Sequence, residues 1–294
     1  MSDGPVGLVA ENDWRAVLER CQALLDRLEQ VLPPAHPPDF RHVQAARWMR
    51  RPLWGGQLIP LRHPAVVGLD ALVGVQRQAQ LLLENTTRFL LGKPANHALL
   101  WGARGTGKSS LVKGVCLGLP EVRLVEVDRA HLGDLPEIIG FLADLPYHFV
   151  IFCDDLSFGF EEGGYRELKV VLDGSLGALG DRVLLYATSN RRHLVAEPMS
   201  DNQDMQRFGE EIHPGEAADE RLALAERFGL QLSFYPFDEQ HYLQAVIRWL
   251  EVYGIEPNDA LLQEARRFAR VRGGRSGRIA NQFVRSIHLG QGNG

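Results

Sequence analysis

The spacing of apolar residues changes twice along the chain, and the three resulting segments predict different structures. Residues 1–64 contain one predicted helix between Asn12 and Pro33, marked by apolar residues at helical spacing: Val17, Leu18, Cys21, Leu24, Leu25, Leu28 and Val31. The proline-dense stretch 33–38 then predicts a stiff, extended connector. We therefore expect residues 1–64 to form an N-terminal helix and linker arm.

Residues 65–236 alternate short apolar runs with helical stretches, which is typical of a parallel sheet covered by helices. Five runs are predicted strands: His97–Trp101, Val122–Val127, His148–Cys153, Val183–Ala187 and Leu230–Phe234. Four stretches between them have helical spacing: Gln76–Leu91, Lys108–Leu117, Asp134–Leu145 and Tyr165–Leu179. This order predicts a doubly wound α/β fold with a parallel five-stranded sheet.

After Pro236 the strand pattern disappears, and three further helices are predicted. Each begins near a polar cap or a glycine: Asp238–Tyr253, Asn258–Val271 and Gly277–Leu289. Residues 237–294 are thus expected to form a small, all-helical second domain.

The clearest chemical signal lies between the first predicted strand and its helix. Gly102-Ala103-Arg104-Gly105-Thr106-Gly107-Lys108-Ser109 fits the phosphate-loop pattern G-x-x-x-x-G-K-[ST] at every fixed position, and Ser110 follows it. The glycines let backbone N–H groups turn toward phosphate oxygens, and Lys108 adds a positive charge at the start of the helix. The Ser109 hydroxyl is a candidate ligand for Mg²⁺. This segment predicts the binding of a nucleotide through its phosphates.

A phosphate loop requires an acidic residue at the end of a neighbouring buried strand. The run His148–Cys153 is followed directly by Asp154 and Asp155. Asp154 is the candidate Mg²⁺ ligand, and Asp155 is placed to polarise the water that attacks the γ-phosphate.

With these motifs in place, the chain from about Pro64 to its end resembles the AAA+ ATPase superfamily. Four further segments carry the resemblance in the superfamily's order: Leu72-Val73-Gly74, Ala187-Thr188-Ser189-Asn190, Glu226-Arg227-Phe228-Gly229 and Gly277-Arg278-Ile279-Ala280-Asn281. In detail the sequence is most similar to a bacterial family of predicted AAA+ ATPases described as a domain of unknown function.

The resemblance implies a role for each of these segments. Val73 and Gly74 would contact adenine, and Asn190 would help to position the attacking water as sensor 1. Arg227 would be the arginine finger that completes the site of a neighbouring subunit. Arg278 would reach the γ-phosphate as sensor 2 from a helical lid, with Arg275 as the alternative. The implied ligands are ATP and Mg²⁺, and the implied assembly is a homo-oligomer, either a ring or a nucleotide-dependent assembly.

One departure from the superfamily's pattern leaves two functions open. Most AAA+ motors carry Asp-Glu where this chain has Asp154-Asp155, and the shorter side chain loses roughly 1.5 Å of reach, enough to cost about 100-fold in rate. The first hypothesis is an ATPase that hydrolyses ATP at subunit interfaces to remodel a macromolecular partner. The alternative is a slowly hydrolysing switch that recruits a partner through residues 1–64 when ATP is bound.

Composition restricts the partners and the cellular compartment. The 294 residues carry 32 Lys+Arg and 37 Asp+Glu, a net charge of −5, which disfavours binding of nucleic acid through bulk charge. Arg47 to Trp54 interleaves arginines with aromatics and could bind single strands, but packing against the sheet or a neighbouring subunit is favoured. We expect a protein partner rather than nucleic acid. Three widely spaced cysteines and the lack of a long apolar run predict a cytoplasmic protein with no membrane insertion.

Overall fold

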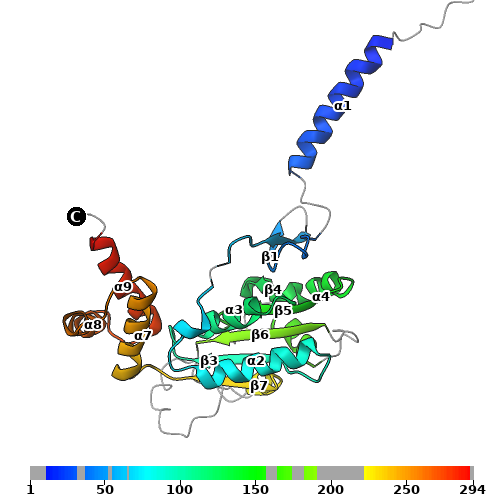
Figure 1. The fold of residues 1–294 in the computed structure, drawn as a ribbon. Helices are drawn as coiled ribbons and strands as arrows, with labels where there is room; N and C mark the ends of the chain where they lie inside the picture. Colours follow the sequence, from blue (N-terminus) through cyan, green and yellow to red (C-terminus); the bar gives the residue numbers. More distant parts are fainter. Residues whose placement is uncertain are drawn as a thin grey trace, which may run out of the picture.

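A computed structural model of the protein describes residues 11–31, 37–51, 55–64, 66–156, 164–173, 182–190 and 222–291. Its centre is a seven-stranded sheet in the order β2-β1-β4-β5-β6-β3-β7 (Figure 1). The strands are β1 (Ala45–Arg51), β2 (Gly55–Pro60), β3 (Ala98–Gly102), β4 (Val122–Val127), β5 (His148–Cys153), β6 (Val183–Ser189) and β7 (Leu230–Phe234). All neighbouring pairs are parallel except β1 with β2.

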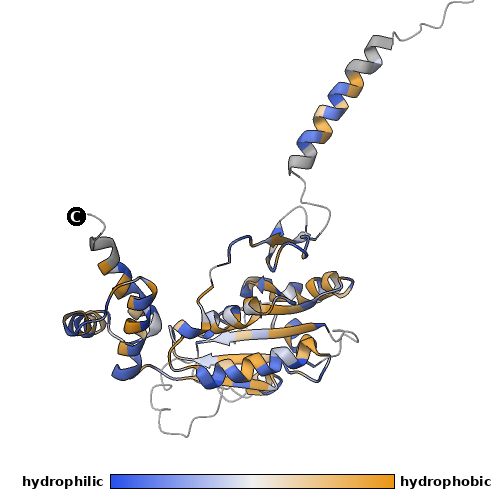
Figure 2. Cartoon of the chain, viewed as in Figure 1, coloured by the Kyte–Doolittle hydropathy of each residue, from blue (hydrophilic) through white to orange (hydrophobic). Residues whose placement is uncertain are grey.

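Helices cover both faces of this sheet, which explains why β5 and β6 are buried along almost their whole length. On one face, α2 (Gln76–Leu90) and α3 (Lys108–Gly118) pack on the strands; on the other, α4 (Leu135–Ala143) and α5 (Tyr165–Leu172) do so. The covering helices are amphipathic, as the mixed colouring of α2 shows (Figure 2). The predicted helix over 165–179 ends earlier, at Leu172, and residues 174–179 lie outside the described residues.

The predicted count of five strands is wrong, because two more strands extend the sheet. All five expected runs are strands, but residues 45–51 and 55–60, assigned from the sequence to the N-terminal arm, form the antiparallel pair β1–β2 beside β4. Trp48 points into the core and is fully buried, and its Nε1 donates a hydrogen bond to Asp134 at 2.9 Å. Arg50 pairs with the same carboxylate. Strands β1 and β2 therefore belong to the α/β unit.

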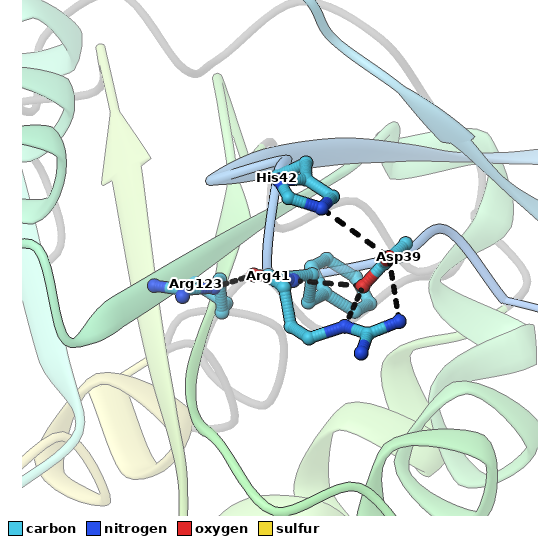
Figure 3. Close-up of polar contacts among 5 residues, drawn as sticks. Asp39, Arg41, His42 and Arg123 are labelled. Carbon is cyan, nitrogen blue, oxygen red and sulfur yellow. Dashed lines mark hydrogen bonds and ion pairs between the residues drawn. The ribbon is translucent and has the colours of Figure 1, made fainter.

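The segment that leads into β1 is fixed by short-range polar contacts and one aromatic side chain (Figure 3). The backbone N–H and Nε of Arg41 donate to Asp39 Oδ1 at 3.1 and 2.9 Å, and these bonds hold the pKa of Asp39 down to about 2. Arg123 of β4 donates from Nε to the carbonyl oxygen of Phe40 at 2.7 Å. The buried Phe40 ring contacts the edge of Phe149 in β5. These contacts attach the start of β1 to the central sheet.

Three C-terminal helices pack around a separate apolar cluster beside the sheet (Figure 1). They are α7 (Glu239–Val252), α8 (Asp259–Val271) and α9 (Gly277–Gln291). The Asp238 carboxylate caps α7 by accepting from the His241 N–H, and Asn258 caps α8 by accepting from the Leu261 N–H. The cluster also includes Val73 from the loop before α2. The three predicted helices are thus present within two residues of their expected bounds.

If β1 belongs to the core, Trp48→Ala will lower the free energy of unfolding by about 3–5 kcal/mol, because it removes a buried ring and leaves Asp134 without one donor. Urea unfolding followed by circular dichroism measures this. Met49→Ala is the matched control in the same strand, since Met49 is 44% exposed, and it should change stability by less than about 0.5 kcal/mol. Equal effects of the two substitutions would contradict the assignment of β1 to the core.

Candidate nucleotide-binding site

The phosphate-loop sequence forms the connection between β3 and α3. β3 ends at Gly102, whose φ of +127° and close approach to the backbone of Phe234 leave no space for a side chain. Gly107, with φ of +99°, is the N-terminal cap of α3, and Lys108 is its first residue. The loop therefore directs the N-terminus of α3, with its free backbone N–H groups, toward the same space as Lys108.

A cavity of about 640 Å³ lies over this loop, between the carboxyl edge of the sheet and the C-terminal helices. Most residues predicted from the sequence line it: Val73, Arg104, Gly105, Thr106, Gly107, Lys108, Ser109, Ser110, Asp154, Asp155, Asn190 and Arg278. Three predicted binding residues, Gly74, Gly102 and Ala103, are not part of the lining. Of these, Gly102 and Ala103 contribute carbonyl oxygens that contact Lys108.

The ammonium of Lys108 is buried and held by uncharged oxygens. It donates to the carbonyl oxygens of Gly102 and Ala103 at 2.9 and 2.7 Å, and to Asn190 Oδ1 at 2.9 Å. Burial lowers the pKa of Lys108 to about 8, although Asp154 and Asp155 act in the opposite direction. A phosphate group would supply the negative charge that these three partners lack.

Ser109 and Asp154 provide a pair of oxygen ligands at one end of the cavity. The Ser109 hydroxyl donates to Asp154 Oδ1 at 2.6 Å, and Thr188 donates to the same oxygen at 2.5 Å. Among the described residues there is no group of three His, Cys, Asp or Glu side chains that could hold a metal alone. A hydroxyl and a carboxylate beside a phosphate loop fit Mg²⁺, which binds few protein ligands and completes its shell with phosphates and water.

Asp155 adopts a backbone conformation that the sequence did not reveal. Its φ is +56°, and among the described residues it is the one non-glycine with positive φ. Its N–H donates to Thr188 Oγ1 at 2.9 Å, and its carboxylate accepts from Asn190 Nδ2 at 2.5 Å. The left-handed conformation costs less for Asp and Asn than for longer side chains, because their short polar groups bond locally. This gives a physical reason for Asp, rather than Glu, at position 155.

Asn190 connects the cationic and acidic sides of the site. Its Oδ1 accepts from Lys108, and its Nδ2 donates to Asp155. A phosphate that displaces Asn190 from Lys108 would therefore also change the surroundings of the Asp155 carboxylate.

Helix α9 adds basic side chains to the cavity lining. The structure also distinguishes between Arg275 and Arg278, which the sequence left as alternative candidates for sensor 2. Arg278 lines the cavity, and its backbone N–H lies 3.4 Å from the carbonyl oxygen of Gly105. Arg275 instead pairs with Glu239 at 3.0 Å and is not part of the lining. Arg285 also lines the cavity and was missed from the sequence. Its spacing of seven residues from Arg278 on a predicted helix was the signal that could have found it.

Apolar side chains also line the cavity and suit contact with a planar base. Val67, Ala71 and Leu72 line it from the sheet side, and Phe237, Ala245 and Trp249 line it from the region of α7. Val73 lies at the junction, since it also packs in the cluster of C-terminal helices. The cavity lining thus combines apolar side chains with the basic side chains of Lys108, Arg278 and Arg285.

Arg227 lies apart from the cavity of its own chain. Its Nε is 2.5 Å from Asp173 Oδ1, directly after α5, and its Nη1 donates to the carbonyl oxygen of Ala223 at 2.6 Å. Its side chain is 26% exposed. The structure does not bring Arg227 to the other predicted site residues, so action on a second subunit stays a prediction.

The parallel core β4-β5-β6-β3-β7, with a phosphate-loop sequence after β3 and acidic residues after β5, has the arrangement of a P-loop fold. Solved AAA+ structures agree with this fold. The FIGL-1 AAA domain in complex with ADP superposes with a TM-score of 0.51 at 20% identity, covering 77% of this chain and 74% of that one. The RuvB Holliday junction branch migration motor of Thermotoga maritima gives 0.50 at 17% identity, covering 74% of this chain and 63% of RuvB.

The Aeropyrum pernix ORC1 protein, solved in complex with DNA, gives a TM-score of 0.52 at 16% identity, covering 78% of this chain and 62% of ORC1. At these identities the likeness concerns the fold. No curated protein sequence matches the chain. The model of the family described as "Protein of unknown function (DUF815)" matches residues 41–291, and the chain belongs to this family. The resemblance inferred from the motifs is thereby confirmed.

In the described part of the chain, no helix has both the length and the apolar character needed to cross a membrane.

Because the free Lys108 has a pKa of about 8, nucleotide binding will take up a proton above that pH. A bound phosphate favours the charged ammonium and raises its pKa, so affinity should be constant below about pH 8 and fall by up to about tenfold per unit above it. Titration calorimetry at about pH 9, in two buffers with different ionisation enthalpies, measures the uptake directly. Binding without proton uptake at that pH would contradict this account of Lys108.

Asp155→Glu will lower the free energy of unfolding by about 1–2 kcal/mol, because the longer side chain loses the local stabilisation of the left-handed backbone. Asp144→Glu is the matched control, since Asp144 is exposed and has an ordinary φ of −80°. Chemical denaturation compares the two variants. An equal, negligible effect at both positions would show that backbone conformation does not select Asp at position 155.

Proposed function

We propose that this protein is an ATPase that binds Mg²⁺ and ATP between the sheet and helices α7–α9. The convergence of Lys108, Asp154, Asp155 and Arg278 on one cavity carries this proposal. Its basic side chains suit a triphosphate, and its apolar lining, which includes Val73, suits adenine. The AAA+ fold adds support, since nucleotide binding is a property of the FIGL-1 domain solved with ADP.

In the proposed reaction, charge neutralisation is divided between the two sides of the cavity. Lys108 opposes the phosphate charge from the loop, and Arg278 opposes it from α9. Ser109 and Asp154 would hold Mg²⁺, which neutralises phosphate charge when bound. Asp155 would accept a hydrogen bond from the attacking water, with Asn190 fixing the orientation of that carboxylate.

Arg227 is proposed to complete the site of a neighbouring subunit. Its distance from its own cavity, its partial exposure and its fixation by Asp173 support a role across an interface. Such a contact is head-to-tail, so it favours a ring or another nucleotide-dependent assembly of identical chains. Rearrangement of α7–α9 against the sheet after hydrolysis would act on a macromolecular partner, with a protein favoured over nucleic acid by the net charge of −5.

One observation favours the alternative, a slowly hydrolysing switch that recruits a partner through residues 1–64. Asp155 is short, and its carboxylate is already bonded to Asn190. Turnover separates the two functions, since a motor requires cycling at about 1 s⁻¹ or more, whereas a switch requires only different partner affinities with and without ATP.

The experiment that tests the shared site is ATP turnover by mixed variants. Lys108→Ala should abolish binding, and Arg227→Ala should lower turnover by about 10³-fold or more while preserving binding. Equal amounts of the two variants, assembled at random, should recover roughly a quarter of wild-type turnover. Half of the sites keep Lys108, and half of those have a neighbouring subunit that keeps Arg227. Arg88→Ala, at an exposed position on α2, is the control that should keep full activity.

Specific activity should also rise with protein concentration. No recovery in the mixture would refute the action of Arg227 across subunits, and negligible turnover with retained ATP binding would favour the switch.

A further inference from the structure

Helix α1 (Glu11–Val31) lies apart from the sheet and the C-terminal helices (Figure 1), and it bears a row of exposed apolar side chains. Trp14, Val17, Leu18, Leu24 and Leu25 are 50–63% exposed. A helix of this length draws most of its stability from packing of its apolar face rather than from helix propensity. We therefore expect a partner to cover these exposed side chains.

The spacing of apolar residues along α1 indicates the kind of partner. Apolar residues recur at alternating steps of three and four over three heptads: Trp14, Val17, Cys21, Leu24, Leu28 and Val31. A continuous repeat of 3.5 residues is the pattern of a coiled coil, in which like helices pack along a shared seam. The opposite face carries Glu19, Gln22 and Asp26, and each is exposed. We propose that α1 pairs with α1 of a second copy of this chain as a parallel coiled coil.

Charge argues for this occupant over a lipid surface. The helix has three arginines and five acidic residues, a net charge of 3 − 5 = −2, whereas helices that bind anionic membranes carry basic polar faces. Leu18 and Leu25 flank the seam on one side, and Arg20 and Arg27 flank it on the other.

The flanking residues also select the parallel direction. In a parallel pair, Arg20 lies beside the partner's Leu25, where its aliphatic stem covers the leucine and its charge stays in water. In an antiparallel pair with Cys21 opposite the partner's Leu24, Arg20 would face the partner's Arg27. Avoidance of this like-charge contact favours the parallel arrangement.

Cys21 makes the proposal testable in the full-length protein. It lies at the centre of the seam and is exposed, whereas Cys116 and Cys153 are buried. A short bis-maleimide should therefore cross-link the wild-type chain into a dimer through Cys21, and Cys21→Ser should abolish the product. The Lys108→Ala variant should cross-link equally, which separates this proposal from the proposed ATPase.

Matched variants test the register of the seam. Leu24→Glu places a charge in the seam and should reduce the cross-linked fraction about tenfold, while Ala23→Glu places the same charge on the outer face and should leave it unchanged. Moving the thiol to the outer face, with Cys21→Ser and Gln22→Cys, should also remove the product. If these variants cross-link as well as the wild-type chain, the product comes from random collision and the proposal is overturned. A wild-type chain that gives no cross-linked dimer would also overturn the proposal.

A second thiol position tests direction. In a Cys21→Ser background, Trp14→Cys should cross-link in a parallel pair, because residue 14 then lies opposite its own equivalent, and should not in an antiparallel one. Failure at position 14 with success at Cys21 would overturn the parallel arrangement. Wild-type protein that stays monomeric in sedimentation but binds vesicles of neutral or anionic lipid would overturn self-pairing in favour of a membrane partner.

Discussion

The buried ammonium of Lys108 is the constraint around which the carboxyl edge of the sheet is arranged. A charge removed from water needs polar partners, and here the end of β3 supplies two carbonyl oxygens while the residue after β6 supplies an amide. None of these partners carries a negative charge, which leaves the site electrostatically incomplete. The glycines of the loop, the position of α3 and the orientation of Asn190 all follow from holding this ammonium in place until an anion arrives.

The same arrangement affects how Asp155 would act. In this structure its carboxylate is bonded to Asn190, which also contacts Lys108, so the acid and the cation share one amide group. A phosphate at Lys108 would compete for that contact and leave Asn190 free to reorient. Asp155 can therefore act as the water-positioning acid although it is shorter than a glutamate. Its backbone conformation and its amide partner differ from those that a longer side chain would require.

The sequence predicted the five parallel strands because each is a short, largely apolar run between helical stretches, and it predicted the phosphate site because the motif is local. It did not predict β1 and β2. Arg47 and Arg50 made that segment look like an exposed arm, and their partners, Glu126 and Asp134, are 79 and 84 residues away in the chain. The conformation of Asp155 was equally inaccessible, since it depends on Thr188 and Asn190 at the end of a different strand.

The hairpin β1–β2 is also linked indirectly, through a series of contacts, to the proposed interface residue Arg227. Trp48 and Arg50 of β1 both bind Asp134, at the end of the helical turn Arg129–Asp134. That turn packs so closely on the start of α5 that a side chain at Gly164 would collide with it. Directly after α5, Asp173 holds Arg227. An unbroken series of contacts thus joins the strand that follows the N-terminal helix to Arg227. Pairing of two N-terminal helices and the contact made by Arg227 would each join subunits, so the two proposed contacts would reinforce each other if one assembly satisfies both.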